Sequence, residues 1–275
     1  MRNVILLGKG FERRYFYNPT SKLFQRGIRV ERIVLWGACN YACPYCKREV
    51  NFVGDDGRPI STRGGSLAEI ADFIHNIDAD TEMLRVSGGD PVTMPLDVWE
   101  FIRGEAAAAD VAVSVATNMS SRPHVERVYT QLDYVAGDFK GTPRYWEKVT
   151  SRSLGYLERT IRNWQLLLQS DVEAEARIPV FPFTTADDID WIVRRLVSVR
   201  TNGLAIVLRN YSPVSWLDWE PTNPEFVLAQ AYRVATTYNV NVVARMRWRT
   251  RTVWYRPDGT AFSVSPSGDL KLWEV

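Results

Sequence analysis

Three cysteines lie close together in the chain and have the spacing of ligands for a metal cluster. They are Cys39, Cys43 and Cys46, in the run Cys-Asn-Tyr-Ala-Cys-Pro-Tyr-Cys, and they are the only cysteines among 275 residues. Three thiolates on one short loop can hold three irons of a cubane iron–sulfur cluster, whose ligands are normally cysteines. Because the sequence has no fourth cysteine, one iron would stay open to bind another molecule.

Two other uses of these cysteines have to be weighed. An odd number of cysteines in a long chain without a secretion signal argues against a disulfide framework. A structural zinc site is usually four-coordinate, and the two histidines, His75 and His124, are distant in the sequence. A non-catalytic zinc-binding or iron–sulfur electron-transfer module therefore stays as the alternative, and the catalytic cluster is the preferred interpretation.

A pair of glycines followed by an acidic residue forms a second motif, Ser87-Gly88-Gly89-Asp90. Glycines let backbone carbonyls approach a ligand closely, and a carboxylate attracts an ammonium group. Together with the cysteine loop, this motif resembles the radical S-adenosylmethionine (radical SAM) superfamily. In that superfamily a Gly-Gly-Glu-Pro motif ends the second barrel strand and binds the amino group of the cofactor. Here aspartate replaces glutamate, so the resemblance implies contact by the backbone and, through a shorter side chain, by Asp90.

Other strand ends resemble cofactor contacts of the same superfamily. Asp138-Phe-Lys140 is similar to the Asp-x-Lys motif of glycyl-radical-enzyme activases, with a surface ion pair as the alternative. Arg177 resembles an arginine that faces the cofactor carboxylate, a role to which the planar guanidinium is suited. The resemblance implies a cofactor site made of Tyr45 (near the adenine), Ser87, Gly88, Gly89, Asp90, Thr117, Asn118, Asp138, Lys140 and Arg177.

The resemblance also implies a reaction, of oxidoreductase type. Its cofactors are a [4Fe-4S] cluster and S-adenosylmethionine, which is cleaved to methionine and a 5′-deoxyadenosyl radical that removes a hydrogen atom from a substrate. An electron donor such as flavodoxin or ferredoxin is expected. Similarity to the compact activases suggests a glycine of a partner enzyme as the substrate; a nucleotide, an RNA or a peptide is the alternative.

Composition favours a single enzyme domain. Lysine and arginine number 34 against 32 acidic residues, a balance that does not by itself indicate nucleic-acid binding. The sequence has no apolar run long enough to cross a bilayer and no signal-peptide pattern, so a cytoplasmic protein with no membrane contact is expected. A cluster with reduced thiols is suited to that compartment.

Strand and helix patterns alternate along the chain, which predicts a parallel α/β sheet with right-handed crossovers. We expect a partial (β/α)6 TIM-like barrel over residues 31–245, preceded by an extension, 1–30, that packs on it, and followed by a C-terminal β-meander, 246–275. The chemistry of such barrels lies at the carboxyl ends of the strands. Strands are predicted at 32–36, 83–86, 111–116, 132–139, 173–180 and 204–209, and helices at 66–77, 96–109, 143–148, 154–168, 187–200 and 224–238.

Four alternating arginines, Arg245, Arg247, Arg249 and Arg251, precede the expected meander. In a strand they would share one face. That face is either solvated, which discourages edge pairing, or part of a site for an anionic substrate such as a nucleotide.

Overall fold

The structure is a computed structural model, and every statement below concerns the residues that it describes. These are residues 5–15, 28–36, 39–46, 52–53, 59–60, 63–121, 128–129, 131–246, 252–265 and 270–273.

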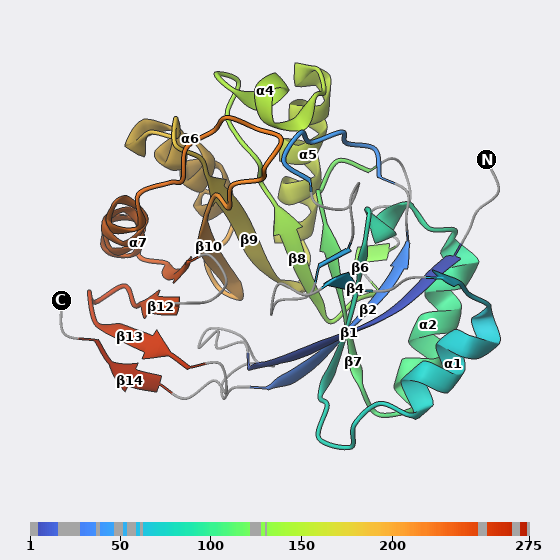
Figure 1. The fold of residues 1–275 in the computed structure, drawn as a ribbon. Helices are drawn as coiled ribbons and strands as arrows, with labels where there is room; N and C mark the ends of the chain where they lie inside the picture. The colour runs from blue at the N-terminus through green and yellow to red at the C-terminus, as the bar shows by residue number, and fades with distance from the viewer. Residues whose placement is uncertain are drawn as a thin grey trace.

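One twisted sheet of twelve strands organises the molecule (Figure 1). Its strand order is β14-β13-β12-β11-β10-β9-β8-β7-β6-β2-β1-β5. The strands from β2 to β11 in this order pair in parallel and are largely buried, as expected of strands covered by crossover helices. They are β2 (Arg29–Trp36), β6 (Met83–Gly88), β7 (Ala112–Thr117), β8 (Tyr134–Asp138), β9 (Glu173–Val180), β10 (Leu204–Asn210) and β11 (Asn241–Arg245).

Helices follow the parallel strands and cover the outer face of the curved sheet (Figure 1). Ser66 caps the first of them in a capping box with Glu69, as the sequence predicts. Among the described residues, none of the helices combines the length and apolar character needed to cross a bilayer. The helices are α1 (Leu67–His75), α2 (Leu96–Ala108), α4 (Trp146–Thr150), α5 (Leu154–Gln169), α6 (Ala186–Val197) and α7 (Pro224–Tyr238), and a 3₁₀ turn, η2, spans Pro91–Thr93.

The predicted partial α/β barrel is confirmed, and the structure adds a seventh parallel strand to the predicted six. That strand, β11, begins at Asn241 and ends at Arg245. No strand is predicted there from the sequence, in which only the alternating arginines that begin at Arg245 stand out. Arg245 pairs in register with Arg209 of β10. Arg247, Arg249 and Arg251 lie outside the described residues, so the proposed arginine face stays a prediction.

Antiparallel strands extend both sides of the parallel sheet. On one side β1 (Ile5–Tyr15) pairs with β2 and with β5 (Arg63–Gly64); β3 (Phe52–Val53) and β4 (Pro59–Ile60) pair separately. On the other side the predicted meander is present as β12 (Thr252–Tyr255), β13 (Ala261–Val264) and β14 (Leu270–Leu272). The division of the chain at residues 30 and 245 remains a proposal.

Alternation along the strands separates an apolar outer face from a polar barrel interior. On β9, Ala174, Ala176 and Ile178 belong to the main hydrophobic core, which lies under the helices, whereas Glu175 and Arg177 alternate with them. Glu175 lies 3.6 Å from Arg85 of β6, and both side chains are 3% exposed. The barrel interior is thus built to carry charged groups, which are seldom buried unless paired.

The glycine that precedes Asp138 is sterically required. A Cβ built on Gly137 would lie 2.5 Å from Cζ2 of Trp164 and 2.8 Å from Cγ of Met119, both buried. We therefore expect Gly137→Ala to lower the free energy of unfolding by about 1–3 kcal/mol through overpacking. Gly104, in α2, has no atom within 4 Å of its built Cβ.

Gly104→Ala is the matched control and should stabilise the protein by about 0.5–1 kcal/mol, since it adds helix propensity without a clash. Urea denaturation of both variants measures the two effects. Equal stability of the two alanine variants would show that β8 shifts to accept the methyl group.

Candidate active site

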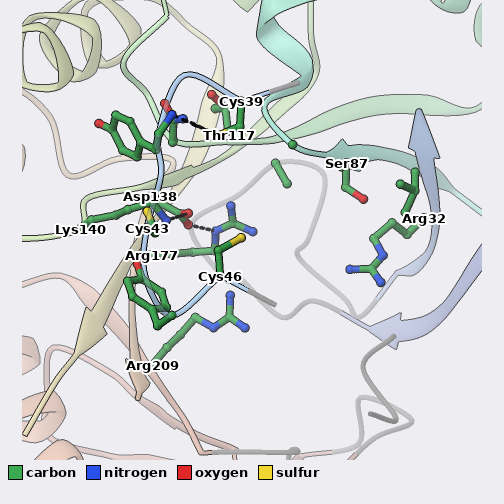
Figure 2. A pocket seen from close by; sticks show the side chains of 17 residues that line it. Arg32, Cys39, Cys43, Cys46, Ser87, Thr117, Asp138, Lys140, Arg177 and Arg209 are labelled. Carbon is green, nitrogen blue, oxygen red and sulfur yellow. Dashed lines mark hydrogen bonds and ion pairs between the residues drawn. The ribbon is translucent and has the colours of Figure 1, made fainter. Parts of the chain in front are cut away.

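The carboxyl ends of the parallel strands surround a cavity of 370 Å³ (Figure 2). Its size lies in the range of small-molecule and cofactor sites. Twelve of the thirteen site residues predicted from the sequence line this cavity. The lining consists of Arg32, Val34, Cys39, Tyr41, Cys43, Tyr45, Cys46, Ser87, Gly88, Gly89, Ala116, Thr117, Asn118, Asp138, Lys140, Arg177 and Arg209.

The cysteine loop is fixed by hydrogen bonds from segments distant in the sequence. Arg152 donates to the carbonyl oxygen of Asn40 at 2.5 Å, and the amide of Ala42 donates to the carbonyl oxygen of Thr150 at 3.2 Å. Trp216 donates through its indole nitrogen to the carbonyl oxygen of Pro44 at 2.7 Å. These bonds position the loop before any ligand binds.

The environment of the three thiols is consistent with a cluster. Burial raises the pKa of the Cys43 thiol to about 11, although the nearby Lys140 acts in the opposite direction. A thiol with such a pKa becomes a thiolate when a metal binds it. Cys39 Sγ accepts from the backbone amide of Tyr41 at 3.4 Å and from the side-chain amide of Asn118 at 3.5 Å. Hydrogen bonds to ligand sulfurs are a usual feature of iron–sulfur centres.

In the part of the chain that the structure describes, no three His, Cys, Asp or Glu side chains are arranged to hold a single metal ion. A cubane cluster separates its thiolate ligands more widely than one ion does. The donor set, three cysteines that line the same cavity, fits the thiolate chemistry of such a cluster.

Asp138 is the centre of an ion-pair network inside the cavity (Figure 2). Its carboxylate lies 2.6 Å from Lys140 Nζ and 2.8 Å from Arg177 Nε. Burial by itself would raise the pKa of Asp138, but Arg177 and Lys140 outweigh it and lower the pKa to about 2. The three side chains are only 12–22% exposed, so the sequence alternative of a surface ion pair is wrong.

Asp90 is the one predicted contact that does not line the cavity. Its side chain is fully buried and accepts hydrogen bonds from the hydroxyls of Thr117 and Ser121, both at 2.7 Å. The carboxylate therefore connects the end of β6 to the end of β7. Ser87, Gly88 and Gly89 do line the cavity, and Gly88 has a φ of 133°, which favours glycine.

A substitution series at Asp90 should reveal this positioning role. Asp90→Ala leaves two buried hydroxyls without their acceptor, so we expect it to lower the free energy of unfolding by about 2–3 kcal/mol. Asp90→Asn should cost less, because the hydroxyls can reorient toward an amide. Asp171→Asn is the matched control at an exposed position and should change stability by less than about 0.5 kcal/mol.

The pH dependence provides a second readout for Asp90. Burial raises the pKa of this carboxyl despite the hydrogen bonds from Ser121 and Thr117. The folded state therefore favours the protonated form, and this contribution to stability is lost as the pH rises from about 4 through the raised pKa. Asp90→Asn should lose less stability over that rise than the wild type does, as measured by urea denaturation at successive pH values. Identical stability profiles for the wild type and Asp90→Asn would contradict the raised pKa of the Asp90 carboxyl.

Tyr45 lines the cavity and belongs to an aromatic cluster beside it. Its ring contacts Phe181, Tyr211 and Trp219, with centroid separations of 5.1–6.3 Å. Within the described part of the chain, its buried hydroxyl has no hydrogen-bond partner. This orphaned polar atom is consistent with a ligand in the cavity, and the predicted packing of Tyr45 near an adenine stays a prediction.

Sequence reasoning missed two arginines of the lining, Arg32 of β2 and Arg209 of β10. Arg32 could have been predicted from the alternation of β2. Arg32 and Val34 are two residues apart in a strand, so their side chains share a face. Arg209 pairs in register with Pro179, two residues beyond Arg177 on the neighbouring strand. Nothing in the isolated sequence reveals that register.

Comparisons with known proteins agree with this site. The family model of the radical SAM superfamily matches residues 33–196. No curated protein matches the sequence significantly. The crystal structure of Streptococcus suis SuiB bound to precursor peptide SuiA has a TM-score of 0.58 at 10% identity and covers 75% of this chain and 46% of that chain.

A structure of TYW1 with a lysine-pyruvate adduct has a TM-score of 0.52 at 11% identity and covers 83% of this chain and 80% of that chain. At such low identities both structures show a shared fold. This chain spans less than half the length of SuiB. Because the superfamily model covers more than half of the sequence, from the strand before the cysteines to α6, the chain belongs to the radical SAM superfamily.

Proposed function

We propose that this protein is a radical SAM enzyme whose cluster and cofactor both bind in the cavity at the strand ends. One observation supports the proposal above all: Cys39, Cys43 and Cys46 line the same cavity as the glycine motif and the Asp138 network. When bound, the [4Fe-4S] cluster supplies one electron to S-adenosylmethionine, which yields methionine and a 5′-deoxyadenosyl radical that removes a hydrogen atom from the substrate. The protein's part is to orient the reactants and exclude other hydrogen donors.

Each lining residue has a role suited to its chemistry. The cysteines would hold three irons, and the backbone carbonyls of Gly88 and Gly89 would accept hydrogen bonds from the cofactor's amino group. Arg177 is suited to a carboxylate, since its guanidinium can donate in a bidentate manner. Asp138 holds Arg177 and Lys140 in place through its ion pairs. Asp90 acts through the position of Thr117 and not by contact.

The substrate has two candidate classes. The similarity of the Asp138-Phe-Lys140 segment to the activase motif favours a glycine of a partner enzyme. The alternative is a nucleotide, an RNA or a peptide; a fold shared with SuiB, whose structure holds a precursor peptide, favours the peptide among these. In either case the reaction would need an electron donor such as flavodoxin or ferredoxin.

The test is an anaerobic assay of the full chain. The protein is reconstituted with iron and sulfide, supplied with dithionite and S-adenosylmethionine, and analysed for 5′-deoxyadenosine and methionine. Equal amounts of both products, formed only with dithionite, would support the proposal. A reducible cluster that binds the cofactor without cleaving it, even with candidate substrates present, would favour an electron-transfer module. Binding of zinc in place of iron and sulfide would overturn the cluster assignment.

A further inference from the structure

The side chain of Asn118, directly after β7, belongs to a closed ring of hydrogen bonds that includes the cysteine loop. Its Nδ2 donates to Oδ1 of Asn40 at 2.7 Å, and Nδ2 of Asn40 donates to Oγ of Ser120 at 2.9 Å. The Ser120 hydroxyl closes the ring by donating to Oδ1 of Asn118 at 2.8 Å. The ring therefore connects the end of β7 to the residue that follows Cys39 in the chain.

A backbone donor fixes the orientation of the Asn118 amide. The backbone N–H of Ser120 donates to Oδ1 of Asn118 at 2.9 Å, which identifies the acceptor end of this side chain. The amide nitrogen has two hydrogens, of which the ring uses one, and the second is donated to Cys39 Sγ at 3.5 Å. Both hydrogens and both lone pairs of the amide thus have partners in the described part of the chain.

The turn that carries Asn118 is itself held in place by α5. Asn163 donates to the carbonyl oxygen of Met119 at 2.7 Å and to that of Ser121 at 3.1 Å. The side chains of the ring are enclosed as well, since Asn118 is 4% exposed and Ser120 is fully buried. Folding has already removed the rotamer freedom of a buried side chain. The contact of Asn118 with the sulfur therefore needs no further ordering when a cluster binds.

A hydrogen bond to a ligand sulfur changes how readily an iron–sulfur cluster is reduced. The reduction potential of such a cluster depends on its net charge and on the hydrogen bonds to its sulfurs. Reduction adds one electron and breaks no bond, so the negative charge near the Cys39 sulfur increases. Because a hydrogen bond to a more negative acceptor is stronger, an N–H at this sulfur stabilises the reduced cluster more than the oxidised one.

We propose that Asn118 is a positioning residue that raises the reduction potential of the cluster through its hydrogen bond to Cys39. Asn40 and Ser120 orient the amide, and Asn118 donates to the sulfur. This inference rests on the proposed function, because it requires the cluster. It gives Asn118 a role that differs from the cofactor contact implied by the sequence resemblance.

A redox titration of the reconstituted protein tests this inference without cofactor cleavage. Dithionite supplies the electrons under anaerobic conditions, and electron paramagnetic resonance measures the reduced cluster. Asn118→Ala removes the donor and should lower the equilibrium constant for reduction roughly tenfold, which is about 59 mV for one electron. Asn118→Asp keeps an oxygen that accepts from Ser120 but removes the N–H, so it should lower the potential at least as far.

Two further variants separate the hydrogen bond to sulfur from the placement of the loop. Asn40→Ala opens the ring but keeps the Asn118 amide, which the backbone N–H of Ser120 still orients, so it should shift the potential much less. Asn202→Ala removes the same side chain from an exposed turn and should leave the potential unchanged. If Asn40→Ala shifted the potential as far as Asn118→Ala, the inference would be wrong, since the ring would act through the loop alone.

A measurement on the wild type decides the matter even if the Asn118 variants bind no cluster. The protein is labelled isotopically in the side-chain amides of asparagine and reduced, and pulsed electron paramagnetic resonance should detect the labelled nitrogen beside the cluster. Absence of this signal, or an unchanged potential in both Asn118 variants, would overturn the inference. Either result in a protein that cleaves S-adenosylmethionine would leave the proposed function intact. The expected shift in a protein that binds the cluster but does not cleave would do the reverse.

Discussion

Replacing Cys43 with alanine is expected to abolish reductive cleavage of S-adenosylmethionine. Cys43 is the middle one of the three proposed ligands, its side chain is 8% exposed, and the sequence has no fourth cysteine to replace it. Two remaining thiolates hold a cubane cluster poorly, because such clusters are normally anchored by more protein ligands. After anaerobic reconstitution the variant should contain less iron and absorb less light at about 400 nm than the wild type. Liquid chromatography of 5′-deoxyadenosine measures the loss of cleavage.

The control for Cys43→Ala lies next to it on the loop. Ala42→Ser places a hydroxyl at an exposed position and keeps all three thiols, so it should retain iron, absorbance and cleavage. Circular dichroism shows whether each variant remains folded. Full cleavage by Cys43→Ala would contradict the assignment of this cysteine to the cluster.

The cluster loop and the barrel could be predicted because both leave local patterns. The spacing of Cys39, Cys43 and Cys46 is readable without a structure, and so are the buried strands that alternate with helices. The Ser66 cap was equally local, since its partner Glu69 is three residues away. These features depend on neighbours in the sequence; the predictions of the barrel and of the cap are confirmed, and the role of the three cysteines as cluster ligands stays a prediction.

Features that depend on neighbouring strands could not be read in this way. The sequence motif suggests that Asp90 meets the cofactor, but Thr117 and Ser121, from the end of β7, hold its carboxylate in the protein interior. The sequence also left open whether Asp138 forms a surface ion pair. Pairing of β8 with β9 decides this, because it sets Arg177 beside Asp138.

Replacing Asp138 with alanine is expected to have the largest effect on stability of the substitutions considered. The change leaves Lys140 and Arg177, 13% and 12% exposed, without the carboxylate that compensates them. Removing one partner of a buried ion pair lowers the free energy of unfolding by about 3–5 kcal/mol. Cleavage should fall as well, since Arg177, the proposed partner of the cofactor carboxylate, loses the ion pair that holds it in place. Urea denaturation and the cleavage assay measure the two effects.

The pH dependence separates the charge of Asp138 from its shape. Because the folded state lowers the pKa of this carboxyl to about 2, its contribution to stability is present above about pH 4 and is lost as the pH falls toward 2. Asp138→Asn keeps the shape and removes the charge, so it should lose less stability than the wild type over that interval. Equal acid profiles would contradict the ion-pair network.

Two comparison variants separate stability from function at Asp138. Glu105→Ala removes the partner of His75 in a solvent-accessible pair, in which the Glu105 side chain is 27% exposed and the His75 side chain 52%. It should lower the free energy of unfolding by at most about 1 kcal/mol. The triple variant Asp138→Ala, Lys140→Met, Arg177→Met removes all three charges and should recover much of the stability, since apolar replacements of buried ions are often tolerated. It should not recover cleavage, because the charged groups proposed to hold the cofactor are gone. If the triple variant were stable and fully active, the network would serve the fold alone, and the cofactor carboxylate would have to bind elsewhere in the cavity.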